Sequence, residues 1–371
     1  MRSDRRLGVG VLGAHAWAEK AHLPGHFANP RTRLVAICDV VEDRARAMAD
    51  RFEIPFVTTD PDELIAHSGV EMVDVCTPTD THLDLSLRSI AAGKHVLCEK
   101  PLARNADDAF RAARAASEKG VRTKLGFTFR FSPAIRLMRE WIAEGRFGQI
   151  LHVHGLEQNS QFLSPDEPLR QVPADVDATQ LIPSSVVGYG SHLVDLIRWC
   201  AGEFDSVVST MNNYVPKRQV RGYEGYAELP IEDGTVALVE FASGAQGMMQ
   251  TSYVAIGNYP GVEIRIYGTE MAAVARLVTE GGIAETLHIA TPDDVEFRPV
   301  TVPGDRFPAG TDVRTPWAEL YYRNLTRIYA DEILDARSEE CTFYDGAKSQ
   351  EIVDALSTSY AERRWVDLPK S

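Results

Sequence analysis

Cysteine is scarce in this sequence of 371 residues, and long apolar runs are absent from it. The five cysteines are an odd number, lie far apart and form no CxxC pair, which argues against a disulfide framework and against a zinc knuckle. We therefore expect buried thiols in a reducing compartment, which indicates a cytoplasmic protein. No apolar run approaches the ~20 residues that a membrane-spanning helix requires, so we expect no membrane partner.

Basic residues are too few to balance the acidic ones. Lys and Arg number 39 against 53 Asp and Glu, which gives a formal net charge of −14. A protein that tracks nucleic-acid phosphates needs clustered positive charge, so we expect no nucleic-acid partner. The length suggests two domains, and it is ample for a sizeable hydrophobic core.

The first third of the chain alternates apolar, β-branched runs with helical stretches. The predicted strands are residues 7–12, 33–38, 72–77, 95–98 and 123–129. The helical stretches between them are residues 14–28, 42–52, 82–92 and 106–119. Such alternation is typical of βαβ units. We therefore predict an α/β fold whose N-terminal domain, residues 1–128, is a Rossmann-type doubly wound parallel sheet.

The pattern changes after about residue 129. A helix is expected over 133–144, a strand over 150–156, a long loop over 158–183 and a helix over 191–200. Short alternating strands joined by turns then occupy residues 204–276, and a long C-terminal helix follows. We predict an α+β domain over residues 129–371 with a large, mostly antiparallel open sheet.

A candidate dinucleotide site lies at the first strand-to-helix turn. Dinucleotide folds use the pattern GxGxxG/A here, so that the helix N-terminus presents amides to the pyrophosphate. Gly13 and Ala18 match the first and third positions, whereas His15 occupies the second. Asp39 ends the second predicted strand 21 residues after Ala18, near the spacing at which an acidic residue binds the adenosine ribose. We predict a cofactor site that includes Gly13, His15, Ala16, Trp17 and Asp39.

The charge of Asp39 also bears on which cofactor binds. A carboxylate there would bind the ribose 2′-hydroxyl and repel a 2′-phosphate, so we expect NAD rather than NADP. The alternative is a doubly wound domain that binds a different ligand. The arginine-rich N-terminus imitates a signal peptide, but cleavage near Ala18 would remove the cofactor turn, so we interpret residues 7–12 as the first strand.

Further segments carry a specific resemblance. They are VCTPTDTH at residues 75–82, AGKHVLCEKPLA at 92–103, GFTFRF at 126–131, GSHLVD at 190–195 and RWVDLP at 364–369. Through them the chain resembles, almost from end to end, the glucose–fructose oxidoreductase/inositol dehydrogenase/rhizopine-catabolism (Gfo/Idh/MocA) family of NAD(P)-dependent sugar oxidoreductases. The resemblance implies hydride transfer between nicotinamide and a secondary hydroxyl or ketone of a sugar, sugar derivative or cyclitol. It also implies a homodimer or homotetramer formed through the C-terminal sheet.

The resemblance implies roles for individual residues as well. Lys100 of the Glu-Lys-Pro triplet matches the family's lysine beside the nicotinamide and the substrate hydroxyl, and His192 matches its catalytic histidine. The peptide bond before Pro101 is often cis in the family. Thr79 stands where the family usually has Asn, and Gly188 stands where it often has an Asp that would bind or polarise the substrate. The other implied cofactor contacts are Thr77, Pro78, Thr79, His82, Glu99, Lys100 and Arg130.

The chemistry of alcohol oxidation also requires groups of these two kinds. An imidazole titrates near neutrality and can take the hydroxyl proton, while an ammonium within hydrogen-bond distance stabilises the developing alkoxide. We assign the proton to His192 and the electrostatic role to Lys100, and the reverse assignment stays open. His154 and Tyr189 are further candidates for contact with the substrate.

Several features also have a simpler interpretation. His192 has Asp195 three residues later, which is a common ion pair on a helix. Two histidine pairs imitate metal sites, but neither has a third ligand nearby in the sequence, so we predict no metal: His22 with His26, and His152 with His154.

Two other functions remain open at this point. One is a glycoside-cleaving or epimerising enzyme that recycles a tightly bound NAD, and the other is a catalytically silent NAD-binding regulator. The presence of both Lys100 and His192 argues against the regulator.

Overall fold

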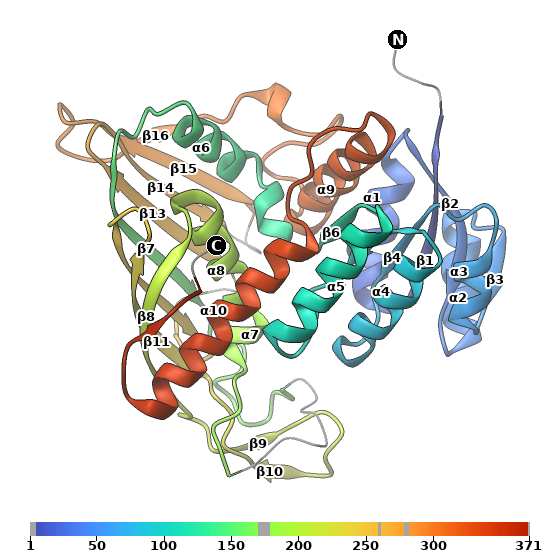
Figure 1. Cartoon of the computed structure of the whole chain (residues 1–371), viewed down its shortest axis with the longest axis horizontal. Helices are drawn as coiled ribbons and strands as arrows, with labels where there is room; N and C mark the ends of the chain where they lie inside the picture. Colours follow the sequence, from blue (N-terminus) through green and yellow to red (C-terminus); the bar gives the residue numbers. More distant parts are fainter. Residues whose placement is uncertain (1–4, 170–178, 259–260, 278–281, 370–371) are drawn as a thin grey trace. The chain divides into compact units, whose positions relative to one another are not determined.

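The computed structural model describes residues 5–169, 179–258, 261–277 and 282–369 (Figure 1). The chain forms two compact units: the first combines Met1–Ser132 with Gly304–Gln350, and the second combines Pro133–Pro303 with Glu351–Ser371. The first unit therefore contains the expected domain of residues 1–128 and, in addition, the later segment Gly304–Gln350. That segment carries α9 (Trp317–Leu334), which packs against α1 (Leu23–Ala28).

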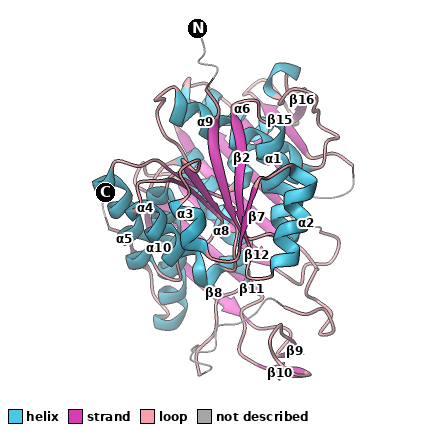
Figure 2. Cartoon of the chain, turned by 90° about the vertical axis from the view of Figure 1, so that its right-hand side faces the viewer, coloured by secondary structure: helices cyan, strands magenta, loops and turns pink. Residues whose placement is uncertain are grey.

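The first unit contains a six-stranded parallel sheet in the order β3-β2-β1-β4-β5-β6 (Figure 2). Its strands are β1 (Leu7–Leu12), β2 (Thr32–Cys38), β3 (Phe56–Thr58), β4 (Met72–Val75), β5 (His95–Cys98) and β6 (Thr123–Leu125). Every residue of β1, β4 and β6 is buried, because helices cover both faces of the sheet. The strand order reverses between β1 and β4, and doubly wound sheets bind ligands beyond the carboxyl ends of the strands at such a point. The predicted parallel doubly wound sheet is confirmed.

Helices on both sides complete this unit. α1 and α2 (Glu42–Phe52) lie on one side of the sheet, and α3 (Pro61–Ala66), α4 (His82–Ala91) and α5 (Ala106–Lys119) lie on the other (Figure 2). The helix expected over 14–28 is a π-helical turn, Ala18–His22, that continues into α1. The side chain of Asn105 begins α5 by accepting a hydrogen bond from the Asp108 N–H at 2.9 Å.

The second unit contains a nine-stranded sheet in the order β16-β15-β14-β13-β7-β12-β11-β8-β17 (Figure 1). Its strands are β7 (Ile150–Gln158), β8 (Phe204–Asn212), β11 (Gly234–Phe241), β12 (Gln246–Ser252), β13 (Val262–Gly268), β14 (Ala272–Leu277), β15 (Glu285–Ala290), β16 (Arg298–Val300) and β17 (Val366–Asp367). β7 and β12 pair in parallel, and the other neighbours pair antiparallel. The mostly antiparallel sheet is therefore confirmed.

The other elements of this unit are shorter or lie against the sheet. A separate ribbon pairs β9 (Lys217–Gln219) with β10 (Tyr226–Glu228). The helices are α6 (Pro133–Ala143), α7 (Ser185–Gly188) and α8 (Gly190–Ala201), and α10 (Phe343–Glu362) contributes its residues from Glu351 onward. Of the long loop expected over 158–183, residues 170–178 lie outside the described part of the chain.

The two faces of the nine-stranded sheet differ in character. On β7, Gly155 faces α8, because a Cβ on it would lie 2.6 Å from Ile197 Cδ1 and 2.8 Å from Leu193 Cδ1. On the opposite face of the sheet, Val236 and Leu238 of β11 leave 42% and 54% of their surface exposed. Helices thus cover one face of the sheet, and the other face presents apolar side chains at its surface.

All five cysteines are free and buried, in agreement with the expectation of reduced thiols. Within the part of the chain that the structure describes, no helix combines the length and the apolar character that crossing a membrane requires.

Candidate functional site

The turn after β1 has a geometry that only glycine permits. Gly13 has φ +99°, and a Cβ on it would lie 2.1 Å from the carbonyl oxygen of Cys76 at the end of β4. The next N–H, of Ala14, donates to Asp39 Oδ2 at 2.8 Å. This bond joins the first turn to the end of β2. Gly13 and Asp39 therefore lie together at the carboxyl edge of the sheet, as the sequence pattern predicts.

Asp39 has further partners at the end of β2. Its Oδ1 accepts a hydrogen bond from the Val41 N–H at 2.9 Å and lies 3.1 Å from a guanidinium nitrogen of Arg44. A carboxylate oxygen accepts more than one hydrogen bond, so these contacts leave capacity for the hydroxyl of a ribose. The residues of this turn thus fit a dinucleotide. Gly13 has no side chain to block the approach of the pyrophosphate, and Asp39 can accept hydrogen bonds from the ribose.

His15, which stands at the second glycine position of the fingerprint, is directed toward the end of β4. Its Nε2 lies 3.9 Å from Cys76 Sγ, and its Nδ1 accepts a hydrogen bond from the Trp17 N–H at 3.3 Å. Burial lowers the pKa of His15, although a hydrogen bond to the backbone of Cys76 opposes this. Ala16 is exposed and Trp17 is half-buried beside it.

The loop after β4 is attached to the segment after β5 through His82. Its Nε2 lies 2.8 Å from the carbonyl oxygen of Thr77, and its Nδ1 lies 2.7 Å from that of Pro101. Burial lowers the pKa of His82, although both backbone contacts oppose the shift. Pro78 and Thr79 belong to the same loop, and the Lys100–Pro101 peptide is cis, as the resemblance implies.

Glu99 accepts hydrogen bonds from three different segments of the first unit. Its Oε1 accepts hydrogen bonds from the Trp17 indole at 3.0 Å and from the Tyr322 hydroxyl, and its Oε2 accepts one from the Lys100 N–H at 3.1 Å. A Cβ on Gly126 would lie 2.7 Å from Oε1, so this glycine makes room for the carboxylate. Lys100 follows directly and is half-buried.

A buried polar cluster lies behind Glu99, and the sequence pattern did not predict it. His22 Nδ1 lies 2.8 Å from Asp74 Oδ2, and His26 Nε2 lies 2.9 Å from the same oxygen. The two histidines thus share a carboxylate. Among the described residues, no group of three or more His, Cys, Asp or Glu side chains is arranged to hold a metal ion. An aspartate within an otherwise apolar strand was a signal in the sequence, whereas nothing in the sequence indicated Tyr322.

Arg130 lies in a short 3₁₀ helix after β6 and is buried. One of its guanidinium nitrogens lies 3.3 Å from Asp345 Oδ1 at the start of α10. The structure therefore places this predicted cofactor residue in the first unit, held by an ion pair to its C-terminal segment.

The second unit presents His192 in the first turn of α8, where it is buried. Its N–H donates to the Tyr189 carbonyl at 3.0 Å. The Tyr189 hydroxyl donates to Gln161 Oε1 at 3.3 Å, and its ring meets the Tyr253 ring edge-on with centroids 5.9 Å apart. Tyr189 and His192 therefore lie next to each other at the N-terminus of α8.

Gly188, where the family often has Asp, has no room for a side chain. A Cβ on it would lie 2.0 Å from the hydroxyl oxygen of Tyr253, which donates to the Ser184 carbonyl at 3.2 Å. The tyrosine hydroxyl thus occupies the space next to Gly188, one helical turn before His192. Tyr253 was not among the predicted residues, because only the fold brings residues 188 and 253 together.

A buried glutamate fixes the segment that leads into this helix. Glu232 accepts hydrogen bonds from the Ser184 N–H at 2.9 Å, the Val186 N–H at 3.1 Å and the Thr235 hydroxyl at 2.9 Å. The Ser185 hydroxyl also donates to it. Burial raises the pKa of Glu232, although these bonds oppose the shift.

His154 lies on the other face of the sheet from α8. Its neighbours along β7, Val153 and Gly155, are buried, whereas its ring packs 5.3 Å from the Tyr267 ring. Burial, together with Arg265 and His152, lowers the pKa of His154. The structure therefore does not bring His154 together with His192.

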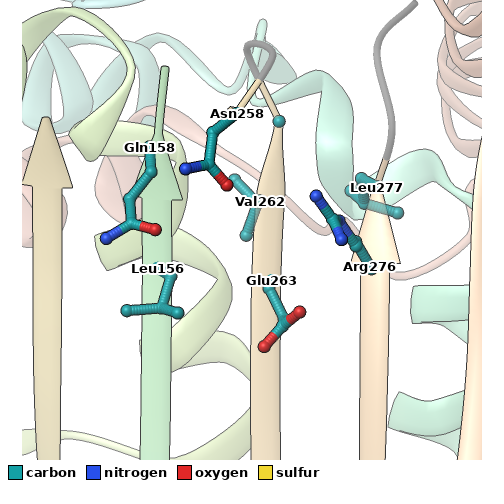
Figure 3. Close-up of a pocket in the computed structure, with 8 residues that line it drawn as sticks. Leu156, Gln158, Asn258, Val262, Glu263, Arg276 and Leu277 are labelled. Carbon is teal, nitrogen blue, oxygen red and sulfur yellow. The ribbon is translucent and has the colours of Figure 1, made fainter. Parts of the chain in front are cut away.

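A pocket lies at one end of β7, β13 and β14, and Figure 3 shows its lining. Gln158, Asn258, Glu263 and Arg276 supply its polar side chains, and Leu156, Val262 and Leu277 supply apolar ones. None of the predicted site residues lines it.

Comparison with protein families gives two adjoining matches. Residues 7–127 match the NAD-binding Rossmann fold of the GFO/IDH/MocA oxidoreductase family, and residues 135–274 match a GFO/IDH/MocA C-terminal domain. Together the two matches span well over half of the chain.

Named relatives cover from 71% to 99% of this chain. A levoglucosan dehydrogenase of Pseudarthrobacter phenanthrenivorans is 27% identical over 99% of both chains. An inositol 2-dehydrogenase of Rubrobacter xylanophilus is 30% identical over 71% of this chain and 70% of its own. The solved structure of levoglucosan dehydrogenase with NADH and levoglucosan superimposes with a TM-score of 0.88 at 25% identity, covering 99% of this chain and 100% of that one.

Proposed function

The chain belongs to the GFO/IDH/MocA oxidoreductase family, and on this premise we propose that it transfers a hydride between NAD and a secondary hydroxyl of a sugar, sugar derivative or cyclitol. The observation that carries the proposal is the carboxyl edge of the parallel sheet, where Gly13, Asp39 and the Glu99–Lys100 segment follow β1, β2 and β5. The names of relatives that act on levoglucosan and inositol support this substrate class.

The cofactor half of the proposal uses residues of the first unit. NAD, when bound, supplies the hydride acceptor. The turn at Gly13 allows the close approach of its pyrophosphate, and Asp39 accepts from the ribose hydroxyls. The negative charge of Asp39 disfavours a 2′-phosphate, so NAD is preferred to NADP. The other residues that contact the cofactor in this proposal are His15, Ala16, Trp17, Thr77, Pro78, Thr79, His82, Glu99 and Arg130.

The proton half of the proposal uses Lys100 and His192. As the hydride leaves the carbinol carbon, the His192 imidazole accepts the hydroxyl proton, and the Lys100 ammonium stabilises the developing charge on the oxygen. Tyr189 precedes His192 by three residues and is the second substrate contact of this unit. His154 lies on the opposite face of the sheet and has no part in this proton transfer.

The test separates cofactor binding from turnover. We would screen sugars, anhydrosugars and inositols for NADH formation, and then compare Lys100→Met with Lys94→Met. Lys94 is a matched control because its ammonium donates to the Val70 carbonyl at 2.7 Å, before the same strand β5.

We expect Lys100→Met still to bind NADH but to lose about 100-fold or more in kcat. Binding is read from tryptophan fluorescence, because the Trp17 and Trp317 rings lie 5.5 Å apart in the same unit as the turn. Lys94→Met should retain full kcat. Equal activity of the two variants would refute the role of Lys100, and no NADH formation with any compound would refute the substrate class.

We also propose that two or four copies assemble through the open face of the nine-stranded sheet. The exposed side chains of Val236 and Leu238 support this, because an apolar sheet surface gains free energy when it is covered. Leu238→Glu should shift light-scattering mass to the monomer, with Glu240→Gln on the same strand as the control. A monomeric parent protein at working concentration would refute the assembly.

A further inference from the structure

The buried cluster behind Glu99 forms one continuous chain of hydrogen bonds. It runs from His26 to Asp74, from Asp74 to His22, and from His22 Nε2 to the Tyr322 hydroxyl at 2.9 Å. Tyr322 contacts Glu99, whose other oxygen holds the Lys100 N–H. Every side chain from His26 to Tyr322 along this chain is buried. The chain therefore connects the interior of the first unit to the segment that carries Lys100.

The hydrogens of this chain can be assigned from its acceptors. Both oxygens of Glu99 act as acceptors, because one meets the Trp17 indole N–H at 3.0 Å and the other the Lys100 N–H at 3.1 Å. Tyr322 has a single hydroxyl hydrogen, which it donates to this carboxylate. The tyrosine oxygen is then left as an acceptor toward His22 Nε2, so that nitrogen must carry a hydrogen.

The other ring nitrogen of His22 also carries a hydrogen. His22 Nδ1 lies 2.9 Å and 2.8 Å from the two oxygens of Asp74, which can only accept as a carboxylate. A histidine with a hydrogen on each nitrogen is an imidazolium. The geometry thus places a positive charge between two carboxylates, 3.3 Å from Glu99 Oε1 on one side.

Electrostatics agree with this count. Burial alone would lower the pKa of His22, but the charges and hydrogen bonds of Asp74 and Cys76, with Asp74 the larger, outweigh it and hold that pKa well above its usual range. Burial alone would raise the pKa of Glu99, but the hydrogen bond and charge of His22, the charge of Lys100 and the Tyr322 hydroxyl hold it below its usual range. The pKa of Asp74 is likewise lowered, against its burial, chiefly by His22.

Three other titratable groups face the cluster. Burial raises the pKa of the Cys76 thiol at the end of β4, although the charge and hydrogen bond of His22 oppose the shift. Burial lowers the pKa values of His15, on the turn after β1, and of His82, at the start of α4. His82 lies between two carbonyl oxygens, that of Thr77 at 2.8 Å and that of Pro101 at 2.7 Å, and these contacts oppose the lowering of its pKa. The positive groups that act on Glu99 itself are His22, whose Nε2 lies 3.3 Å from Oε1, and Lys100.

We propose that His22 is a permanently charged imidazolium and acts, through Tyr322 and Glu99, as a positioning residue for Lys100. Its charge keeps Glu99 ionised, and the ionised Glu99 holds the Lys100 backbone and the Trp17 indole in place. The link to Lys100 rests on the proposed function, whereas the charge of His22 does not. The two are therefore tested by different measurements.

Nuclear magnetic resonance of the protein labelled with ¹⁵N-histidine tests the charge. A neutral imidazole has one protonated nitrogen and an imidazolium has two, so the two forms differ in their ring nitrogen signals. We expect one histidine of the parent protein to stay an imidazolium from pH 6 to pH 9. In Asp74→Asn its pKa should fall by about 1–3 units, because the carboxylate charge that favours the imidazolium is removed. A parent protein in which every histidine is neutral at pH 8 would overturn the proposal.

The pH profile of kcat/KM tests the link to Lys100. Tyr322→Phe and Asp74→Asn should displace the profile, because both weaken the fixed charge behind Glu99. Tyr329→Phe is the matched control: it removes another buried hydroxyl from α9, one that donates to the Val96 and Arg122 carbonyls, at 2.9 and 2.8 Å. Its profile should coincide with that of the parent.

The outcomes separate the two hypotheses. If the imidazolium is present but all three variants share the parent profile, His22 does not position Lys100. If the Asp74→Asn signal shifts as expected while the parent oxidises none of the sugars or cyclitols, the proposed function fails and the buried charge stands.

Discussion

The close contact between Gly188 and Tyr253 gives a prediction that can be worked through in numbers. Gly188 ends α7 and has no positive φ, so replacement by alanine meets no backbone strain. In a helix, alanine is favoured over glycine by up to about 1 kcal/mol. The new Cβ, however, would lie 2.0 Å from the Tyr253 hydroxyl oxygen. Overpacking of this kind costs about 1–3 kcal/mol, so Gly188→Ala should destabilise the protein by about 0–3 kcal/mol.

Removal of the Tyr253 hydroxyl should reverse the sign of this effect. The next ring atom, Cζ, lies 3.4 Å from the position of the Cβ, which is an ordinary van der Waals contact. Tyr253→Phe alone loses the hydrogen bond to the Ser184 carbonyl, a cost of about 0.5–1.5 kcal/mol. In that background Gly188→Ala should stabilise the protein by up to about 1 kcal/mol.

The assay is denaturant unfolding of the parent, both single variants and the double variant. The cycle should give a coupling energy of about 1–3 kcal/mol in favour of the double variant. Additive effects of the two substitutions would show that the hydroxyl does not occupy the space beside Gly188, and the explanation for the glycine would be wrong.

Three further predictions concern the first unit. Asp39→Asn should raise the ratio of kcat/KM for NADP to that for NAD by about 10-fold, because it removes the charge that repels a 2′-phosphate; an unchanged ratio would contradict the role of Asp39. Lys124→Met should cost about 3–5 kcal/mol in denaturant unfolding, because it leaves Glu332, 2.7 Å from the ammonium, as an unpaired buried charge; adding Glu332→Gln should recover part of the loss. The pKa values of Asp74 and Glu99 are lower in the folded protein than the values of about 4 in the unfolded chain, so both carboxylates stabilise the fold above about pH 4. This contribution is lost as the pH falls through their folded pKa values. The denaturant midpoint of unfolding should therefore drop in acid, and a midpoint that does not change with pH would contradict this.

The fold of each unit could be largely predicted because its periodicity is strong. Continuous apolar runs in the sequence indicate buried parallel strands, and short runs of alternating apolar and polar residues joined by turns indicate an antiparallel sheet. The membership of α9 in the first unit could not be predicted, since it depends on tertiary contacts such as the bond from the Asn29 side chain to the Thr326 carbonyl at 3.0 Å. No pattern within a single segment records such a contact.

The candidate site divides in the same way. Gly13 and Asp39 could be found because their spacing reflects a local turn and a strand end. His154 illustrates what the alternation of side chains along a strand cannot predict. The alternation placed His154 and His152 on the same face of their strand, but it did not indicate which face packs against α8. Asp74 and Tyr322 lie 248 residues apart in the sequence and meet only through His22, so the cluster behind Glu99 became visible only in the structure.

The central claim is hydride transfer to NAD from a secondary carbinol carbon, and isotope transfer tests it most directly. A sugar or cyclitol that the protein oxidises would be prepared with deuterium on that carbon, and the NADH formed would be examined by mass spectrometry. The account predicts one deuterium in each NADH formed. NADH without deuterium, with the label released to water, would contradict it.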